Sequence, residues 1–221
     1  MRKGLTEIVF IMDKSGSMSG LEADTIGGYN SFLAKQKEAE GEAYISTVLF
    51  DTTNEVIHDR VPIEQVEAMT AEQYRVGGGT ALLDALGGAI HHIGNVHKYA
   101  RDEDRPEKTI FIITTDGMEN SSRMYTFDRV KKMVEFQTNR FGWEFLFLGA
   151  NMDAISAAGR MGIRPERAVQ YECDSEGTAL NYRVLSETVC MARCADISLQ
   201  DAIGADWKTE IERNYAKRKR S

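Results

Sequence analysis

Cysteine, proline and long apolar runs are all scarce in this sequence of 221 residues. Three cysteines, Cys173, Cys190 and Cys194, cannot all pair within one chain, which excludes a disulfide-rich secreted scaffold. The longest apolar stretches, such as residues 8–12 and 145–150, are only as long as a strand, so no transmembrane helix is expected. The basic first residues are followed by Thr6 and Glu7 rather than by the apolar segment of a signal peptide. We therefore expect a cytoplasmic protein that does not contact a membrane.

Low-complexity segments and a basic surface are missing as well. Apolar residues make up 42% of the chain and charged residues 28%, which is ordinary for one globular domain and too apolar for a disordered chain. The net charge is −7, and an acidic protein is a poor platform for phosphate groups, so no nucleic-acid partner is expected. Residues 208–220 are the exception, with six Lys or Arg and two Glu. We interpret them as a solvated basic tail.

The apolar pattern predicts strands that alternate with helices. Residues 8–12 are a continuous apolar run, typical of a strand that is buried on both faces, and residues 109–113 and 144–148 are expected to be two further central strands. Residues 43–50 and 55–61 form a hairpin, because the four residues between them are too few for a crossover. Its second strand is polar, which suits a sheet edge, and residues 168–171 are a further weak strand. The alternation predicts an α/β fold with a doubly wound, mostly parallel sheet.

Helix starts are predicted from capping residues. Ser19 and Glu22 have the spacing of a capping box, and Thr80 follows three glycines at the expected start of a long helix. Ser198 and Asp201 have the same spacing at the C-terminal end, where an apolar residue recurs every four positions through residue 215. We divide the chain into a domain of residues 1–195 and an extension of residues 196–221. The extension either docks on its own domain or serves as a docking helix for a partner.

Three loops at the carboxyl ends of predicted strands carry hydroxyls and carboxylates. Asp13, Ser15 and Ser17 follow the first strand at a spacing of two, which places their side chains on one side. Thr80 ends the glycine loop, and Asp116 follows the strand at 109–113. Ligands of open α/β sheets bind where the strand order reverses, so these five groups converge if the two strands are neighbours there.

Oxygen ligands without cysteine or histidine suit a hard cation. Two carboxylates and three hydroxyls are too few for a closed calcium cage, whereas Mg²⁺ takes few protein ligands and keeps waters. Mg²⁺ is the expected ion, with Mn²⁺ or Ca²⁺ as substitutes in vitro. At least one coordination position remains for an outside group, and an anionic oxygen is its natural occupant because two carboxylates only neutralise the ion.

The pattern resembles the metal-ion-dependent adhesion site (MIDAS) of von Willebrand factor A (vWA) domains. Its parts are Asp13-x-Ser15-x-Ser17, Gly-Gly-Thr80 and Thr-Asp116-Gly, and the resemblance covers roughly residues 5–195 in element order. It implies that Ser15 and Ser17 coordinate the metal directly, that Thr80 and Asp116 do so directly or through water, and that Asp13 acts through water. It also implies six strands in the order 3-2-1-4-5-6 with one antiparallel edge strand. The Asp-x-Ser-Gly-Ser-Met form looks most like intracellular bacterial members, including those of tellurite-resistance type.

The expected function is Mg²⁺-dependent binding of a protein partner whose Asp or Glu completes the metal sphere. We expect a monomer or weak homo-oligomer that is not an enzyme. The alternative is a metal-assisted hydrolase that acts on a phosphate-bearing substrate. Its support is weak, because the sequence contains no Gly-x-x-x-x-Gly-Lys-Ser/Thr loop and no Gly-x-Ser-x-Gly elbow, and no histidine follows any of the three loops. A scaffold with a vestigial site is the third possibility, and retention of all five oxygen ligands argues against it.

Overall fold

A computed structural model of the chain describes residues 1–219, which build a six-stranded sheet in the order β3-β2-β1-β4-β5-β6. The strands are β1 Arg2–Asp13, β2 Glu42–Phe50, β3 Asn54–Pro62, β4 Pro106–Thr115, β5 Glu144–Ala150 and β6 Ala168–Tyr171. All neighbours are parallel except β2 and β3. The predicted strand order and the antiparallel edge hairpin are both confirmed.

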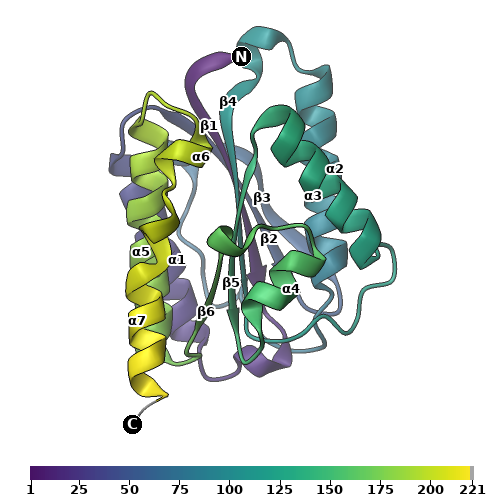
Figure 1. Cartoon of the computed structure of the whole chain (residues 1–221), viewed down its shortest axis with the longest axis vertical. Helices are drawn as coiled ribbons and strands as arrows, with labels where there is room; N and C mark the ends of the chain where they lie inside the picture. Colours follow the sequence, from purple (N-terminus) through teal and green to yellow (C-terminus); the bar gives the residue numbers. More distant parts are fainter. Residues whose placement is uncertain (220–221) are drawn as a thin grey trace.

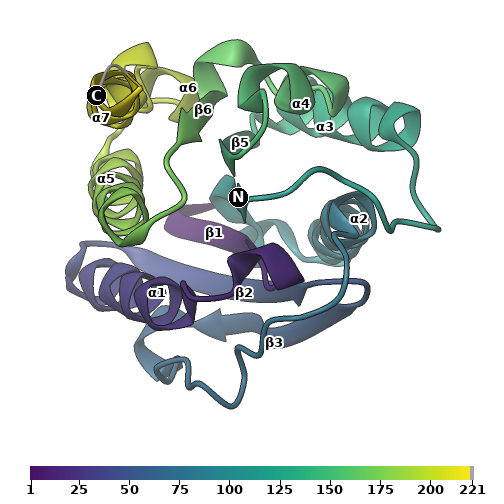
Figure 2. The same ribbon diagram turned by 90° about the horizontal axis from the view of Figure 1, so that it is seen from below.

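Helices cover both faces of this sheet (Figure 1). They are α1 Glu22–Glu38, α2 Leu82–Tyr99, α3 Phe127–Phe141, α4 Ala154–Arg160, α5 Ser175–Cys194, α6 Leu199–Ala202 and α7 Thr209–Arg218. Figure 2 shows α1, α5 and α7 on one side of the sheet and α2, α3 and α4 on the other. Within residues 1–219, no helix combines the length and the apolar character needed to cross a membrane.

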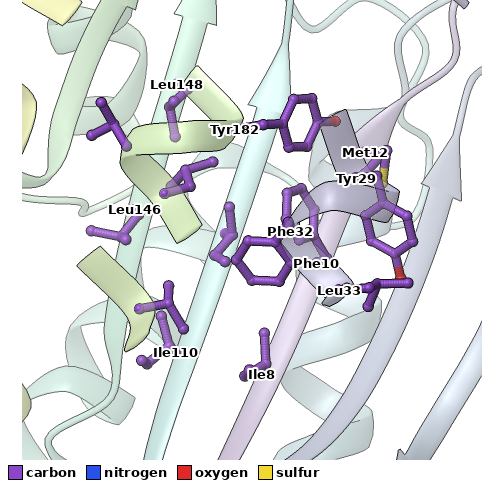
Figure 3. Close-up of a cluster of buried hydrophobic side chains, with 14 of the residues drawn as sticks. Ile8, Phe10, Met12, Tyr29, Phe32, Leu33, Ile110, Leu146, Leu148 and Tyr182 are labelled. Atoms are coloured by element: carbon purple, nitrogen blue, oxygen red, sulfur yellow. The ribbon is translucent and has the colours of Figure 1, made fainter. Parts of the chain in front are cut away.

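The central strand β1 divides its side chains between two apolar cores. Ile8, Phe10 and Met12 belong to the core under α1 and α5, while Val9 and Ile11 belong to the core under α2 and α3. This alternation follows from the period of two in a strand. The ring of Phe10 lies 5.4 Å from that of Tyr29, 5.3 Å from that of Phe32 and 6.0 Å from that of Tyr182 (Figure 3). Residues on both sides of strand β1 thus hold it rigidly, and its end at Asp13 is fixed with it.

Two predicted helix starts are wrong by a few residues. Residues Gly16–Met18 form a 3-10 turn, and α1 begins only at Glu22 with Leu21 in the N-cap position. Ser19 is therefore the C-cap of this turn and not the N-cap of α1, and the Glu22 carboxylate accepts from the amide of Gly20 instead. Helix α2 begins at Leu82 rather than at Thr80, because loop hydrogen bonds occupy both the amide and the carbonyl of Thr80.

The C-terminal extension docks on its own domain. Ser198 caps α6 as predicted, but the expected single helix is broken at Gly204 and continues as α7. The apolar ridge is buried in the α1–α5 core through Leu199, Ile203, Trp207 and Ile211. This face is therefore covered and does not serve as a docking surface for a partner. The boundary between residues 1–195 and 196–221 stays a prediction.

The basic end of the chain is less solvated than predicted. Lys208 is buried, and its ammonium group donates to the carbonyls of Pro165 and Ala168 at 2.9 and 2.8 Å. Arg218 forms ion pairs with Asp174 and Glu176. These contacts tie α7 to the elements beside it. The last two residues of the predicted tail, 220–221, lie outside the described residues.

Candidate metal centre

Asp13 stands at the end of β1 with both carboxylate oxygens engaged. Its Oδ1 accepts from the Ser15 amide at 2.7 Å, and its Oδ2 accepts from Thr115 Oγ1 at 2.6 Å. Burial raises the pKa of Asp13 above its usual value, although the two donors oppose that shift and the nearby Asp116 carboxylate adds to it. A carboxylate held in this way fixes the loop that follows β1 against the end of β4.

Ser15, Ser17 and Asp116 form a continuous chain of oxygens. The Ser15 and Ser17 hydroxyls lie 3.1 Å apart, and Ser17 Oγ donates to Asp116 Oδ1 at 2.5 Å. Ser15 and Asp116 are buried, whereas Ser17 is exposed. These residues meet because β1 and β4 are neighbours in the sheet, as predicted, and Asp13 ends β1 while Asp116 directly follows β4.

Thr80 reaches the same point from the glycine loop. A methyl group on Gly117 would lie 3.3 Å from Thr80 Oγ1 and 3.4 Å from Ser17 Oγ, so both hydroxyls border the space above this glycine. Backbone hydrogen bonds hold the loops in this position. The Gly16 amide donates to the carbonyl of Gly78 at 3.2 Å, and the Gly77 amide donates to that of Lys14 at 2.9 Å.

The loop after Asp116 is clasped to the start of α2. The Glu119 carboxylate accepts from the Leu83 amide at 2.9 Å, and Ser122 Oγ accepts from the Asp84 amide at 3.0 Å. In return, the Asp84 carboxylate accepts from the amides of residues 123–125. These bonds satisfy amides at the helix start that have no partner within the helix. They also fix Thr80 relative to Asp116.

The donor set fits a hard divalent cation. The structure brings together all five residues predicted from the sequence: Asp13, Ser15, Ser17, Thr80 and Asp116. Their side chains offer oxygen alone, and within residues 1–219 there is no group of three or more His, Cys, Asp or Glu that would hold a metal. Two carboxylates with three hydroxyls suit an ion that keeps water, as Mg²⁺ does, better than zinc. The assignment of the five residues as ligands stays a prediction.

Sequence reasoning missed three neighbours of the site. Cys173 Sγ lies 3.7 Å from Asp116 Oδ2, and burial together with that carboxylate raises the pKa of Cys173 to about 12. The buried Tyr74 hydroxyl donates to the carbonyl of Asp13. Lys14 is buried and paired with Glu55 at 2.7 Å. The only available signal was that Cys173 follows the predicted strand at 168–171, which ends at the same sheet edge.

The comparisons with known proteins identify the fold. No protein-family model and no curated protein matches the sequence. A von Willebrand factor type A structure from Catenulispora acidiphila aligns with a TM-score of 0.58 at 14% identity, covering 84% of this chain and 43% of that one. The fold is vWA-like.

Two further structures share this vWA-like fold. Proximal thread matrix protein 1 from the mussel byssus, with zinc in its MIDAS motif, aligns with a TM-score of 0.56 at 13% identity and covers 84% of this chain and 46% of that one. The pilus adhesin SpaC from Lactobacillus rhamnosus GG gives 0.60 at 13% identity, covering 84% and 30%. The present chain thus spans less than half the length of these neighbours.

Proposed function

We propose that this vWA-like domain binds a protein partner through a bound Mg²⁺ ion, with a partner Asp or Glu completing the coordination sphere. The observation that carries the proposal is the chain of oxygens from Ser15 through Ser17 to Asp116, bordered by the Thr80 hydroxyl. Two structural neighbours support it, since one has zinc in its MIDAS motif and another is a pilus adhesin.

Each residue would contribute differently to holding the ion. Ser15 and Ser17 would coordinate it through their hydroxyls, and Thr80 and Asp116 would do so directly or through water. Asp13 would act on the ion through water, because its carboxylate already accepts from the Ser15 amide and Thr115 Oγ1. The bound ion supplies a positive charge at the protein surface that attracts a carboxylate. Mn²⁺ or Ca²⁺ would replace Mg²⁺ in vitro.

Binding rather than catalysis is proposed because the reactive side chains beside the site are restrained. The Cys173 thiol donates to Asp116 Oδ2 at 3.7 Å, so it is engaged with a proposed metal ligand and is not free to act as a nucleophile. The Lys14 ammonium group is buried and paired with Glu55, so it is not free to orient a phosphate-bearing substrate. The metal-assisted hydrolase is therefore the lesser candidate.

We also propose the cellular setting. The Asp13-x-Ser15-Gly-Ser17-Met form favours intracellular bacterial vWA proteins, including those of tellurite-resistance type, as relatives. The three cysteines are unpaired thiols, as suits a reducing cytoplasm. A monomer or weak homo-oligomer is the proposed state.

The first experiment measures Mg²⁺ binding without a partner. Mg²⁺ is titrated calorimetrically into the wild type, Thr80→Ala and Thr138→Ala. Thr138→Ala is the matched control because Thr138 lies near the far end of α3. We expect Thr80→Ala to bind Mg²⁺ at least about tenfold more weakly, as loss of a metal-site group typically does, with the control unchanged. Equal binding by all three chains would contradict the assignment.

The second experiment tests the partner. Wild-type and Thr80→Ala baits are passed over native lysate in Mg²⁺ and in EDTA, and the expected partner is captured only by the wild type in Mg²⁺. Capture that persists in EDTA would show that the partner binds without the metal ion. Hydrolysis of p-nitrophenyl phosphate that requires Mg²⁺ and disappears in Thr80→Ala would favour the hydrolase instead.

A further inference from the structure

A large cavity lies between α2 and α3, at the end of the sheet opposite the metal loops. Its volume is about 890 Å³, and it reaches the first residues of β4 at Pro106, Glu107 and Thr109. The metal loops follow the last residues of the same strand, so the two sites are separated by its length. Cavities of about 300–1,000 Å³ are the size that binds small organic molecules. In Figure 1 this end of α2 and α3 lies near the N-terminus.

The cavity wall is rich in aromatic side chains. Trp143 is buried at its base and stacks on Phe111, with ring centroids 5.3 Å apart. Phe136 and Phe141 stand on the α3 side with 58% and 52% of their surfaces exposed, and their rings pack edge to face. Large aromatic residues that stay this exposed beside a cavity mark a surface that an apolar molecule covers.

Gly94 keeps the space between the two helices open. It lies in the middle of α2 and lines the cavity, and a methyl group placed on it would meet only the Gln137 amide nitrogen, at 3.0 Å. A glycine inside a helix costs about 0.5–1 kcal/mol relative to alanine. Its presence at this position leaves room that a larger side chain would fill.

The rim of the cavity is positively charged in a protein whose net charge is −7. Four cationic side chains line the cavity with one carboxylate, that of Glu107: the cations are Lys98, Arg105, Arg129 and Lys132. Two of these cations pair with carboxylates outside the lining, Arg105 with Asp102 at 3.4 Å and Lys132 with Asp128 at 3.3 Å, which leaves an excess of one positive charge. Arg105 is held in place because its Nε donates to the carbonyl of His97 at 2.8 Å. Glu107 is itself engaged, since its Oε2 accepts from the Gly4 amide at 2.8 Å.

We propose that this cavity binds a small amphiphilic carboxylate, with its apolar body on Trp143, Phe136 and Phe141 and its carboxylate at the cationic rim. The aromatic wall accounts for the apolar part of the ligand, and the excess of cations accounts for its charge. The volume limits the ligand to a molecule of medium size, such as a fatty acid of about ten carbons or an aromatic acid.

Decanoate is the probe, titrated in EDTA so that the metal site takes no part. The chain has two tryptophans, Trp143 at the cavity and Trp207 in the opposite core, so intrinsic fluorescence reports binding and Trp207→Phe isolates the Trp143 signal. Calorimetry on the wild type measures the same affinity without that substitution. We expect saturable binding of decanoate and at least about tenfold weaker binding of decyltrimethylammonium, which has the same tail and the opposite charge.

Two matched pairs of variants locate the binding site. Lys132→Glu and Lys131→Glu each change the same charge on α3 and each break one ion pair within the helix, but only Lys132 lines the cavity. Gly94→Leu fills the cavity, while Gly27→Leu places the same side chain on α1, where nothing lies within 4 Å of the new Cβ. We expect about tenfold weaker decanoate binding in Lys132→Glu, loss of binding in Gly94→Leu, and no change in the two controls.

Three outcomes would overturn the proposal. The first is no saturable binding of decanoate to the wild type by either method. The second is equal affinity for decanoate and decyltrimethylammonium, which would leave an apolar groove without selection for an anion. The third is self-association of the wild type in sedimentation that Gly94→Leu abolishes, which would assign the cavity to a second copy of the chain.

Discussion

Gly117→Ala is the sharpest test of the metal centre, because it adds one methyl group at the point where two proposed ligands meet. That methyl would lie 3.3 Å from Thr80 Oγ1 and 3.4 Å from Ser17 Oγ. The contact with Thr80 Oγ1 is tight and needs that side chain to shift by a few tenths of an ångström, whereas the contact with Ser17 Oγ is ordinary. The φ angle of Gly117 is not positive, so the backbone accepts alanine. Coordination is more demanding, because hydroxyl oxygens must approach Mg²⁺ to about 2.1 Å. A methyl between them opposes that approach.

The magnitude follows from linkage between binding and folding. Mg²⁺ at a hundredfold excess over its Kd stabilises the wild type by about 2.7 kcal/mol, which raises Tm by about 5–10 °C for a domain of this size. Tenfold weaker binding in Gly117→Ala would reduce the stabilisation to about 1.4 kcal/mol at the same concentration, so the rise in Tm is roughly halved. Hundredfold weaker binding would leave about 0.4 kcal/mol.

The assay is a thermal melt of each chain in EDTA and in Mg²⁺. Gly159→Ala is the control, because it changes a helical glycine in α4 that has nothing within 4 Å of the new methyl. The control should keep the full Mg²⁺ response. Gly117→Ala should melt near the wild type in EDTA and respond about half as strongly, or less, to Mg²⁺. A full Mg²⁺ response in Gly117→Ala would refute the placement of the ion between Thr80 and Ser17.

Three further predictions address the site and the fold. Asp116→Asn removes a buried charge, so it should melt no lower than the wild type in EDTA and gain less from Mg²⁺; an equal Mg²⁺ shift would contradict the site. Gly28→Ala places a methyl 2.1 Å from an α5 aromatic ring and should cost about 1–3 kcal/mol in urea unfolding, whereas Gly27→Ala should gain about 0.5–1 kcal/mol. Ile211→Ala should cost about 2–5 kcal/mol, because Ile211 is buried; a cost no larger than that of the exposed Arg213→Ala would show that α7 is not part of the core.

The sheet was predictable because its signals are local. Residues 8–12 are apolar throughout, and residues 109–113 and 144–148 are apolar after Thr109 and Glu144, and such runs fit strands that lie between two layers of helices. The three residues between β2 and β3 allow only an antiparallel connection. The site residues followed from the topology, since Asp13 ends β1 and Asp116 comes directly after the neighbouring β4.

Contacts between distant segments were not predictable from the same patterns. Cys173 lies 57 residues from Asp116 in the sequence, and Tyr74 lies 61 residues from Asp13. No spacing rule connects such pairs, because they meet only when the sheet and the helices are packed. The burial of Lys14 follows likewise from Glu55, which is placed beside it by the hairpin.

The predicted starts of two helices were wrong for a different reason. A capping motif predicts a helix only if no competing local structure takes the same residues. The 3-10 turn at Gly16–Met18 directly precedes Ser19, so Ser19 is not in the position of an N-cap for α1. Loop hydrogen bonds hold Thr80 outside α2. In the extension, Gly204 ends one helix, and the apolar residues beyond it still reach the core from a second one.

The two edges of the sheet are closed to other chains in different ways. Strand β3 carries charged side chains, a positive φ at Arg60 and register shifts opposite residues 45–48. At the other edge, β6 has four residues, and the Ala168 carbonyl accepts from Lys208 at 2.8 Å. Bulges, charges and short strands all oppose strand addition from a neighbouring molecule. Association through the loops or helices is therefore separated from aggregation through the sheet.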